Sequence, residues 1–491
     1  MTAKNQQVQN SIIYMFPMIS GSLLPFITLP IFTRILTKED YGALALANIY
    51  AILATGIANF GMSVGFERNY FQFRDDKKKM AQLLYSTLSF VLTIFLLLAG
   101  ITYVLRAKIS TLFIGSPSSG NLVFWAFCGH FFFTIAIQFY LIFYKNAERA
   151  TDFSLYTIAS GVMNFLISLF LVAGLRTGII GIVYSQLISG ALIFVILSYK
   201  FLKIFPLSLN KAIFMESFRI SYPLTPRVFL GVIGTQFDTF MINLLATLGG
   251  AGLYHIGRKI SEVIFAFMNS LENVFQPQVY KRMFDLKEKG GESIGTYLTP
   301  FIYISISLAL AVSLFAEELI FVLTPKSYHE AANIVVILSM YYGFLFFGKI
   351  VGPQLIFKKK THITSLLTFV IIGINVALNI PLIMKFGAIG AAWGTFLSGM
   401  ISGFICIIIS QRYYRINWET AKIGAIFFIF FGSAILLTVF NYFAVDYLIK
   451  LLFKALALIG YGCLGIKLKI ISKENIVLVK NIIIFKRAAT A

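Results

Sequence analysis

The chain is 491 residues long; 58% of these are hydrophobic and only 12% are charged, and the net charge is +21. A soluble globular chain carries about a quarter charged residues, so this composition excludes an ordinary soluble protein and predicts an integral membrane protein. The basic excess alone would suggest nucleic-acid binding, but its distribution along the chain, given below, argues against a nucleic-acid partner.

Apolar stretches of about 20 residues, the length of a helical membrane span, recur along the whole chain. None shows the alternation over about ten residues that is typical of a transmembrane β-strand, so we predict an all-α polytopic membrane protein. The fourteen predicted spans are 11–33, 43–66, 81–105, 121–144, 153–175, 178–199, 217–246, 250–278, 296–323, 331–357, 362–384, 387–410, 421–444 and 447–466.

Lysine and arginine alternate between the two sides of this arrangement. With the N-terminus inside, 28 of the 41 basic residues lie in inside segments, eight in outside connections and five within spans. Cytoplasmic loops of membrane proteins carry this basic excess. The pattern therefore predicts a multi-pass protein with both termini cytoplasmic, and it accounts for most of the charge without nucleic acid.

The first predicted span is an uncharged run, 12–32, followed by charges in the motif PIFTRILTKEDYG at 30–42. Arg34 lies at the edge of this span. Its guanidinium either faces a cavity, or it extends to the outer membrane interface or pairs there with Glu39 or Asp40. The second span has a polar face that includes Asn59. The fourth span carries His130, which is either a packing residue or a proton relay.

The seventh predicted span carries Arg227 and Asp238, which share a helical face. They are eleven residues apart, which is about 16 Å along a helix axis, so they cannot pair within their own helix. Each one therefore needs a partner elsewhere in the protein, a substrate or water.

The eighth span has a polar stripe whose members recur at spacings of three and four. They are Tyr254, Arg258, Glu262, Phe265, Asn269, Glu272 or Asn273, and Gln276. Such a stripe cannot face lipid, so it indicates contact with protein or a water-filled cavity. Arg258 and Glu262 are spaced to neutralise each other, which leaves the charge of Lys259 in excess. Lys349, in the tenth span, has no acidic neighbour in sequence and needs one from across the bundle.

Two segments of the chain repeat each other. TGIIGIVYSQLISG at 177–190 and FGAIGAAWGTFLSG at 386–399 share five identical positions at a constant offset. The offset places six spans in each half, which predicts a parallel repeat of two six-helix bundles, as in one class of alternating-access transporters. The predicted domains are an N-terminal bundle (1–200), a cytoplasmic linker (201–216), a C-terminal bundle (217–410), two additional helices (411–466) and a basic cytoplasmic tail (467–491).

The charges at membrane depth have a positive balance. The cations are Arg34, Arg227, Arg258, Lys259 and Lys349, and the acids are Asp238, Glu262 and Glu272. This balance favours an anionic head group such as a diphosphate, which arginine binds bidentately. Asn59 and Asn269 add polar groups. We expect no cofactor and no metal; the candidates for proton or sodium coupling are Asp238, Glu262, Glu272 and His130.

Three segments together resemble the bacterial polysaccharide flippases, the O-antigen (Wzx-like) exporters of the multidrug/oligosaccharidyl-lipid/polysaccharide superfamily. They are the motif at 30–42, GAGLYHIGRKI at 250–260 and GAIGAAWGTFLSG at 387–399. The resemblance implies a V-shaped pair of six-helix bundles, with Arg34 as a cavity cation near a gate. The two helices after 410 depart from the commonest twelve-helix exporters and are similar to those of lipid II flippases.

The resemblance also implies a function: moving an undecaprenyl-diphosphate-linked oligosaccharide, for O-antigen, capsule or exopolysaccharide, across the bacterial cytoplasmic membrane. Its expected partners are the lipid-linked oligosaccharide, the bilayer, and polysaccharide polymerase and chain-length proteins. Two alternatives stay open. A cation-coupled drug antiporter of the same superfamily would need an acid-lined cavity. A membrane polysaccharide polymerase or ligase would need a large outer loop with catalytic residues, whereas the outer connections here are short.

Overall fold

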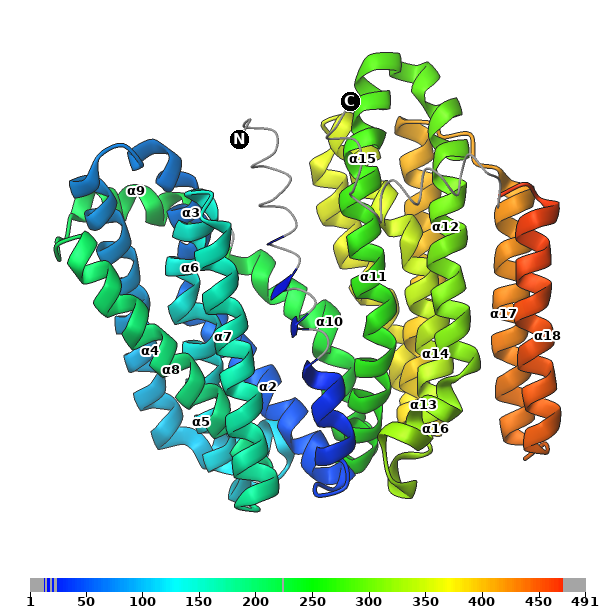
Figure 1. Ribbon diagram of the computed structural model, residues 1–491, viewed down its shortest axis with the longest axis horizontal. Helices are drawn as coiled ribbons and strands as arrows, with labels where there is room; N and C mark the ends of the chain where they lie inside the picture. Colours follow the sequence, from blue (N-terminus) through cyan, green and yellow to red (C-terminus); the bar gives the residue numbers. More distant parts are fainter. Residues whose placement is uncertain (1–12, 14–15, 18–19, 22–23, 223–224, 471–491) are drawn as a thin grey trace. The chain divides into compact units, whose positions relative to one another are not determined.

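The computed structural model describes residues 13, 16–17, 20–21, 24–222 and 225–470, without the side chains at 226–233, 235, 361 and 365. Within that part the regular elements are all helical, which confirms the predicted all-α class. The chain divides into two compact units, Met1–Gly252 and Leu253–Ala491 (Figure 1). The start of the first predicted span and most of the predicted basic tail lie outside the described residues.

Ten helical segments in the described part are long and apolar enough to cross a membrane. Two of them, Leu248–Leu314 and His362–Tyr413, have 67 and 52 residues, which is too long for one crossing of a hydrocarbon core about 30 Å thick. The first covers the predicted span 250–278 and most of 296–323, and the second covers 362–384 and 387–410. The first predicted span lies partly outside the described residues, and the exact count of fourteen stays a prediction.

The N-terminal unit packs its helices around a core rich in phenylalanine. α2 packs against α4 and α5, α8 packs against α5 and α7, and the short α9 packs against α3 and α4. Phe66, Phe127, Phe131 and Phe139 are fully buried in this core. The helices are α2 (Lys38–Asn59), α3 (Met62–Phe73), α4 (Lys77–Ile114), α5 (Gly120–His130), α6 (Ile137–Asn146), α7 (Ala150–Leu169), α8 (Ile179–Ile204), α9 (Lys211–Ser221) and α10 (Thr225–Leu245).

Local sequence signals set the helix starts in this unit. Thr37 and Asp40 form a capping box at the start of α2, in which each side chain accepts a hydrogen bond from the other residue's backbone N–H. Asp76 caps α4 in a similar way, accepting from the backbone N–H groups of Lys78 and Lys79. The polar part of the motif at 30–42 therefore has a structural role, because it begins α2.

The C-terminal unit is built on two long helical segments. α12 packs against α14 and α17, and α16 packs against α14 and α15. The last two helices, α17 and α18, lie side by side as an antiparallel pair (Figure 1). The helices are α11 (Leu248–Leu286), α12 (Gly290–Leu314), α13 (Ala316–Leu323), α14 (Ala331–Phe344), α15 (Gly348–Phe357), α16 (Thr361–Tyr413), α17 (Thr420–Tyr442) and α18 (Tyr447–Lys467).

The repeated sequence segments adopt the same local structure. Gly178 has φ 70° and ψ −155°, and its counterpart Gly387 has φ 58° and ψ −134°. These conformations are strained for any residue with a Cβ. In both segments this glycine starts the matched helix: it precedes α8, and it divides α16 into two helices.

The matched glycines Gly190 and Gly399 explain how these helices pack. A Cβ on Gly190 of α8 would lie 2.5 Å from the backbone nitrogen of Phe133, in the π-helical turn Phe131–Ala136 that follows α5. A Cβ on Gly399 of α16 would lie 2.6 Å from the ring of Tyr341 on α14. Small residues at such positions allow close helix contacts. The sequence repeat is therefore also a repeat of packing.

Candidate functional site: the polar face of α11

The helix α11 has one apolar and one polar face. Ile260, Ile264 and Met268 on the apolar face are buried in the C-terminal unit. The predicted polar stripe runs along the other face, where most of its members are only partly buried. With 39 residues, α11 is about 58 Å long, so it extends well beyond the hydrocarbon core of a bilayer.

Arg258 and Glu262 pair on this face, as their spacing allows. Arg258 Nε donates to Glu262 Oε1 at 2.8 Å. The guanidinium is largely buried, whereas the carboxylate is more exposed. The hydroxyl of Tyr342, on α14, also interacts with Arg258. Glu262 is therefore the more accessible partner of this pair.

Lys349, at the start of α15, has the acidic partner that its own segment lacks. Its Nζ lies 2.7 Å from Glu272 Oε2 and donates to Asn269 Oδ1 at 2.6 Å. The ammonium group also lies 4.8 Å from the centre of the Phe265 ring, a cation–π contact. All three partners belong to the predicted stripe on α11, so this face and α15 form one polar site.

The site carries one excess positive charge. Arg258 and Lys349 are matched by Glu262 and Glu272, whereas Lys259 forms no ion pair with the residues that the structure describes. Around it stand aromatic side chains, including Phe265 and Tyr342. The arrangement suits an anion, because three cations meet only two acids. Arg258 and Lys259 lie on α11, and Lys349 lies on the neighbouring α15.

The other predicted site residues belong to the N-terminal unit. Arg34 is exposed; its Nη1 donates to the carbonyl oxygen of Pro30, and it forms no ion pair within the described part of the chain. Within the described part of the chain Arg34 forms an ion pair with neither Glu39 nor Asp40, and Asp40 accepts hydrogen bonds from Thr37 in the capping box. Asp238 is buried on α10.

Three further predicted residues lie on helices of the same unit. Asn59 ends α2, where its amide donates to Ser63 Oγ and its Oδ1 is buried without a described partner. His130 ends α5, directly before the π-helical turn Phe131–Ala136, a local irregularity that is frequent at functional sites. Arg227 lies on α10, and its side chain is outside the described part of the chain.

Sequence reasoning missed a second charged cluster in the C-terminal unit. Lys454 on α18 is fully buried and lies 2.6 Å from Glu318 of α13, and Lys450 lies 3.3 Å from Glu317. Tyr447 donates to Glu318 as well. The sequence signal was available: two lysines at i and i+4 inside an apolar helix require acidic partners. We define these four side chains, Lys450, Lys454, Glu317 and Glu318, as the α13–α18 charge cluster.

The fold and the apolar segments define a multi-pass α-helical membrane protein, with a polar face on α11. The fold is similar to that of the lipid II flippase MurJ in an inward closed conformation, with a TM-score of 0.65 at 15% identity over 94% of this chain and 99% of that one. It is also similar to an inward-facing multidrug resistance MATE family transporter of the MOP superfamily (TM-score 0.62, 16% identity, covering 84% and 98%).

The chain belongs to the polysaccharide biosynthesis protein family, whose model matches residues 7–279. It is 23% identical over 195 residues to the probable low-salt glycan biosynthesis flippase Agl15 of Haloferax volcanii, covering 40% of this chain and 41% of that protein. It is 27% identical over 208 residues to the capsular polysaccharide biosynthesis protein CapF of Staphylococcus aureus, covering 42% and 51%. The matches thus span about half or less of these relatives.

Proposed function

We propose that the protein moves an undecaprenyl-diphosphate-linked oligosaccharide across the bacterial cytoplasmic membrane by alternating access. The observation that carries this proposal is the polar face of α11, where Arg258 and Lys259 lie on a helix long and apolar enough to span a membrane and Lys349 of α15 pairs with Glu272. Intramembrane charges are costly and mark substrate or ion pathways. The relatives' names, a glycan biosynthesis flippase and a capsular polysaccharide biosynthesis protein, support a cargo from the same class.

The geometry suggests how an anionic head group is held. Arg258 and Lys349 are kept extended by carboxylates, so phosphate oxygens can take the place of Glu262 and Glu272 with little rearrangement of the cations. Lys259 supplies a third positive charge. Phe265 and Tyr342 offer aromatic faces against which a sugar can stack. The lipid tail stays in the bilayer, and no covalent bond is made or broken.

The same exchange offers a route to ion coupling. When phosphate takes the cations, Glu262 and Glu272 lose their partners, which leaves their carboxylates available to a coupling cation. Asp238 and His130 are further candidates in the N-terminal unit. We propose proton or sodium coupling at one or more of these groups, with polysaccharide polymerase and chain-length proteins as partners that use the exported cargo.

The fold likeness to MATE transporters favours a cation-coupled drug antiporter as the second candidate. A cationic drug would have to displace Arg258 or Lys349 and bind a site with one excess positive charge, which is unfavourable. A cationic substrate therefore fits this site less well than a diphosphate.

A gene deletion tests the proposal and identifies the cargo. Lipid-linked oligosaccharides are extracted from the deletion strain, and their sidedness is measured with an impermeant glycan-modifying reagent. We expect complete repeat units on the cytoplasmic face and loss of surface polysaccharide. Single units on the outer face would instead indicate a polymerase or ligase. Unchanged glycan with altered drug sensitivity would indicate the antiporter.

A further inference from the structure

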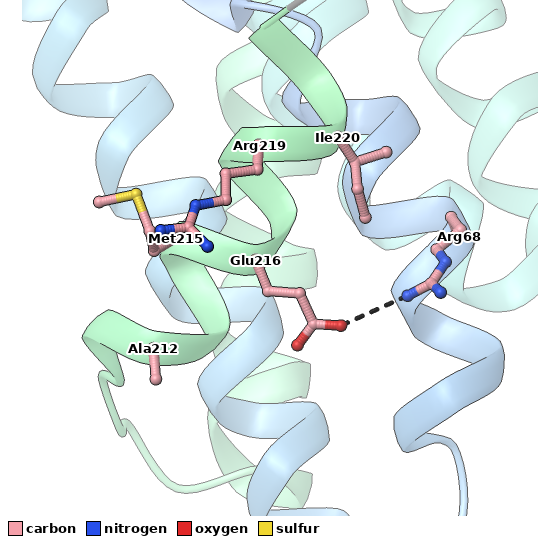
Figure 2. A pocket seen from close by; sticks show the side chains of 6 residues that line it. All are labelled: Arg68, Ala212, Met215, Glu216, Arg219 and Ile220. Carbon is pink, nitrogen blue, oxygen red and sulfur yellow. Dashed lines mark hydrogen bonds and ion pairs between the residues drawn. The ribbon is translucent and has the colours of Figure 1, made fainter.

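The N-terminal unit has a charged site of its own, formed by α3 and α9. A pocket of about 540 Å³ lies between α3 and α9, within the size range of small-ligand sites. Figure 2 shows its lining, which comes from α3 and the short helix α9. The lining residues are Arg68, Ala212, Met215, Glu216, Arg219 and Ile220.

The two walls of this pocket are fixed against each other. A Cβ on Gly65 of α3 would lie 2.6 Å from the carbonyl oxygen of Ser217, and one on Gly61 would lie 2.6 Å from that of Ser221. Asn69 donates to the buried Ser217 Oγ at 2.8 Å. This close crossing of small residues holds α9 on α3, so the pocket is preformed.

Aromatic contacts seal the apolar face of α9 against the same unit. Phe218 stacks on Phe60 with ring centres 5.7 Å apart, and Phe214 packs against Phe90 at 5.1 Å. The polar face of α9, which carries Glu216 and Arg219, faces the pocket. By the charge pattern of the chain, this is the predicted cytoplasmic side of the membrane.

Arg68 offers an unused binding edge in this pocket. Its hydrogen bonds, to Asn69, Gln72 and Glu216, all come from Nη1. Its Nε and Nη2 donate to no residue that the structure describes. These two groups form one of the guanidinium edges that bind phosphate bidentately. The ion pair with Glu216 is long, 3.4 Å, and exposed, and such surface pairs add little stability.

The charge of the pocket also favours an anion. Arg219 lines it, is exposed, and forms no ion pair within the described part of the chain. In Figure 2 its side chain extends along α9, while Arg68 and Glu216 point toward each other. Exposed side chains change rotamer within nanoseconds, so Arg219 can close on a bound group. Two arginines against one glutamate leave one positive charge.

We infer that this pocket binds the diphosphate of the lipid-linked cargo as a loading site on the predicted cytoplasmic side, before the cargo reaches the polar face of α11. The inference rests on the proposed function for the identity of the cargo. Arg68 takes the phosphate oxygens on its Nε–Nη2 edge, Arg219 closes over them, and Glu216 competes with them for Arg68. Met215 and Ile220 provide apolar contacts for the start of the lipid chain.

Thiol protection tests the inference at the site itself. The full-length protein with Cys463→Ser, which removes the exposed native cysteine, carries Ala212→Cys in the pocket. The rate of maleimide labelling of this introduced thiol is measured with pyrophosphate, with undecaprenyl diphosphate, and with phosphatidylglycerol vesicles. The matched control is Lys211→Cys, an exposed position that does not line the pocket.

We expect pyrophosphate and undecaprenyl diphosphate to slow labelling at position 212 and not at 211. Adding Arg68→Gln and Arg219→Gln should raise the concentration for half-protection at least about tenfold. Glu216→Gln should lower the concentration for half-protection, because it removes the acid that competes for Arg68. Arg74→Gln, which changes an exposed arginine outside the pocket, should leave this concentration unchanged. Melting temperature confirms that the variants are folded.

Two results would overturn the inference: no protection by either diphosphate, or protection by phosphatidylglycerol as strong as that by the diphosphates, which would make the pocket a general phospholipid site. The outcome is separate from that of the proposed function. Protection without cytoplasmic accumulation in the deletion strain would leave an anion pocket and reject the flippase. Accumulation without protection would keep the flippase and reject the loading site.

Discussion

At the scale of single residues, the site consists of two cations, Arg258 and Lys349, each paired with a carboxylate. The Arg258–Glu262 pair follows from a spacing of four within one helix, and sequence alone anticipates it. The partner of Lys349 does not follow from any local spacing, because Glu272 comes from another helix. Its need for an acid was predictable from the cost of an intramembrane charge, but the identity of that acid required the fold.

A double-mutant cycle tests the pair between α11 and α15. Glu272→Gln and Lys349→Gln should each lower the free energy of unfolding in detergent, because each leaves a partly buried charge without its partner. The double variant should lose less than the sum, with a coupling of about 0.5–3 kcal/mol. Lys281→Gln, on an exposed lysine further along α11, serves as the control. Additive effects would show that the two residues do not interact.

At the scale of helices, glycine positions and buried charges decide how the spans pack. The spans themselves were predictable, because a bilayer demands about 20 apolar residues for each crossing. The matched glycines were visible in the sequence, but their contacts were not: Gly190 touches backbone, whereas Gly399 touches the movable ring of Tyr341. The division of α16 at Gly387 agrees with the predicted boundary between two spans.

This difference between the matched glycines gives a prediction for α8. Gly190→Ala should destabilise the protein by about 1–3 kcal/mol, since the new methyl group meets the backbone of Phe133 and cannot be accommodated by a side-chain rotation. Gly100→Ala in α4, where no atom lies within 4 Å, should be neutral or stabilising. Thermal unfolding in detergent measures both. Equal melting temperatures for the two variants would refute the close contact.

The α13–α18 charge cluster gives a second prediction at this scale. Glu317→Gln with Glu318→Gln leaves Lys454 buried and unpaired, which should cost about 3–5 kcal/mol of stability. Adding Lys450→Met and Lys454→Met should restore much of the lost stability, because a buried apolar side chain needs no acidic partner. Lys467→Met, at the exposed end of α18, is the control. A fully stable glutamine double variant would contradict the cluster.

At the scale of the whole molecule, sequence analysis recovered the class, the family and most of the spans, since hydropathy and charge alternation extend over the entire chain. It missed contacts between distant segments. Lys454 and Glu318 are 136 residues apart, and Arg68 and Glu216 are 148 apart. The periodicities of a strand (two residues) and of an α-helix (3.6 residues) relate only nearby positions. Contacts between such distant residues are therefore seen only in the folded chain.

The central claim is that the protein moves a lipid-linked oligosaccharide between leaflets with the help of Arg258. The direct measurement uses cargo from the deletion strain, reconstituted with purified protein in vesicles, and follows its arrival in the outer leaflet. We expect transfer well above that in protein-free vesicles for the wild type and for Lys281→Gln, and at least about a tenfold slower rate for Arg258→Gln. Transfer by the wild type no faster than in protein-free vesicles would contradict it.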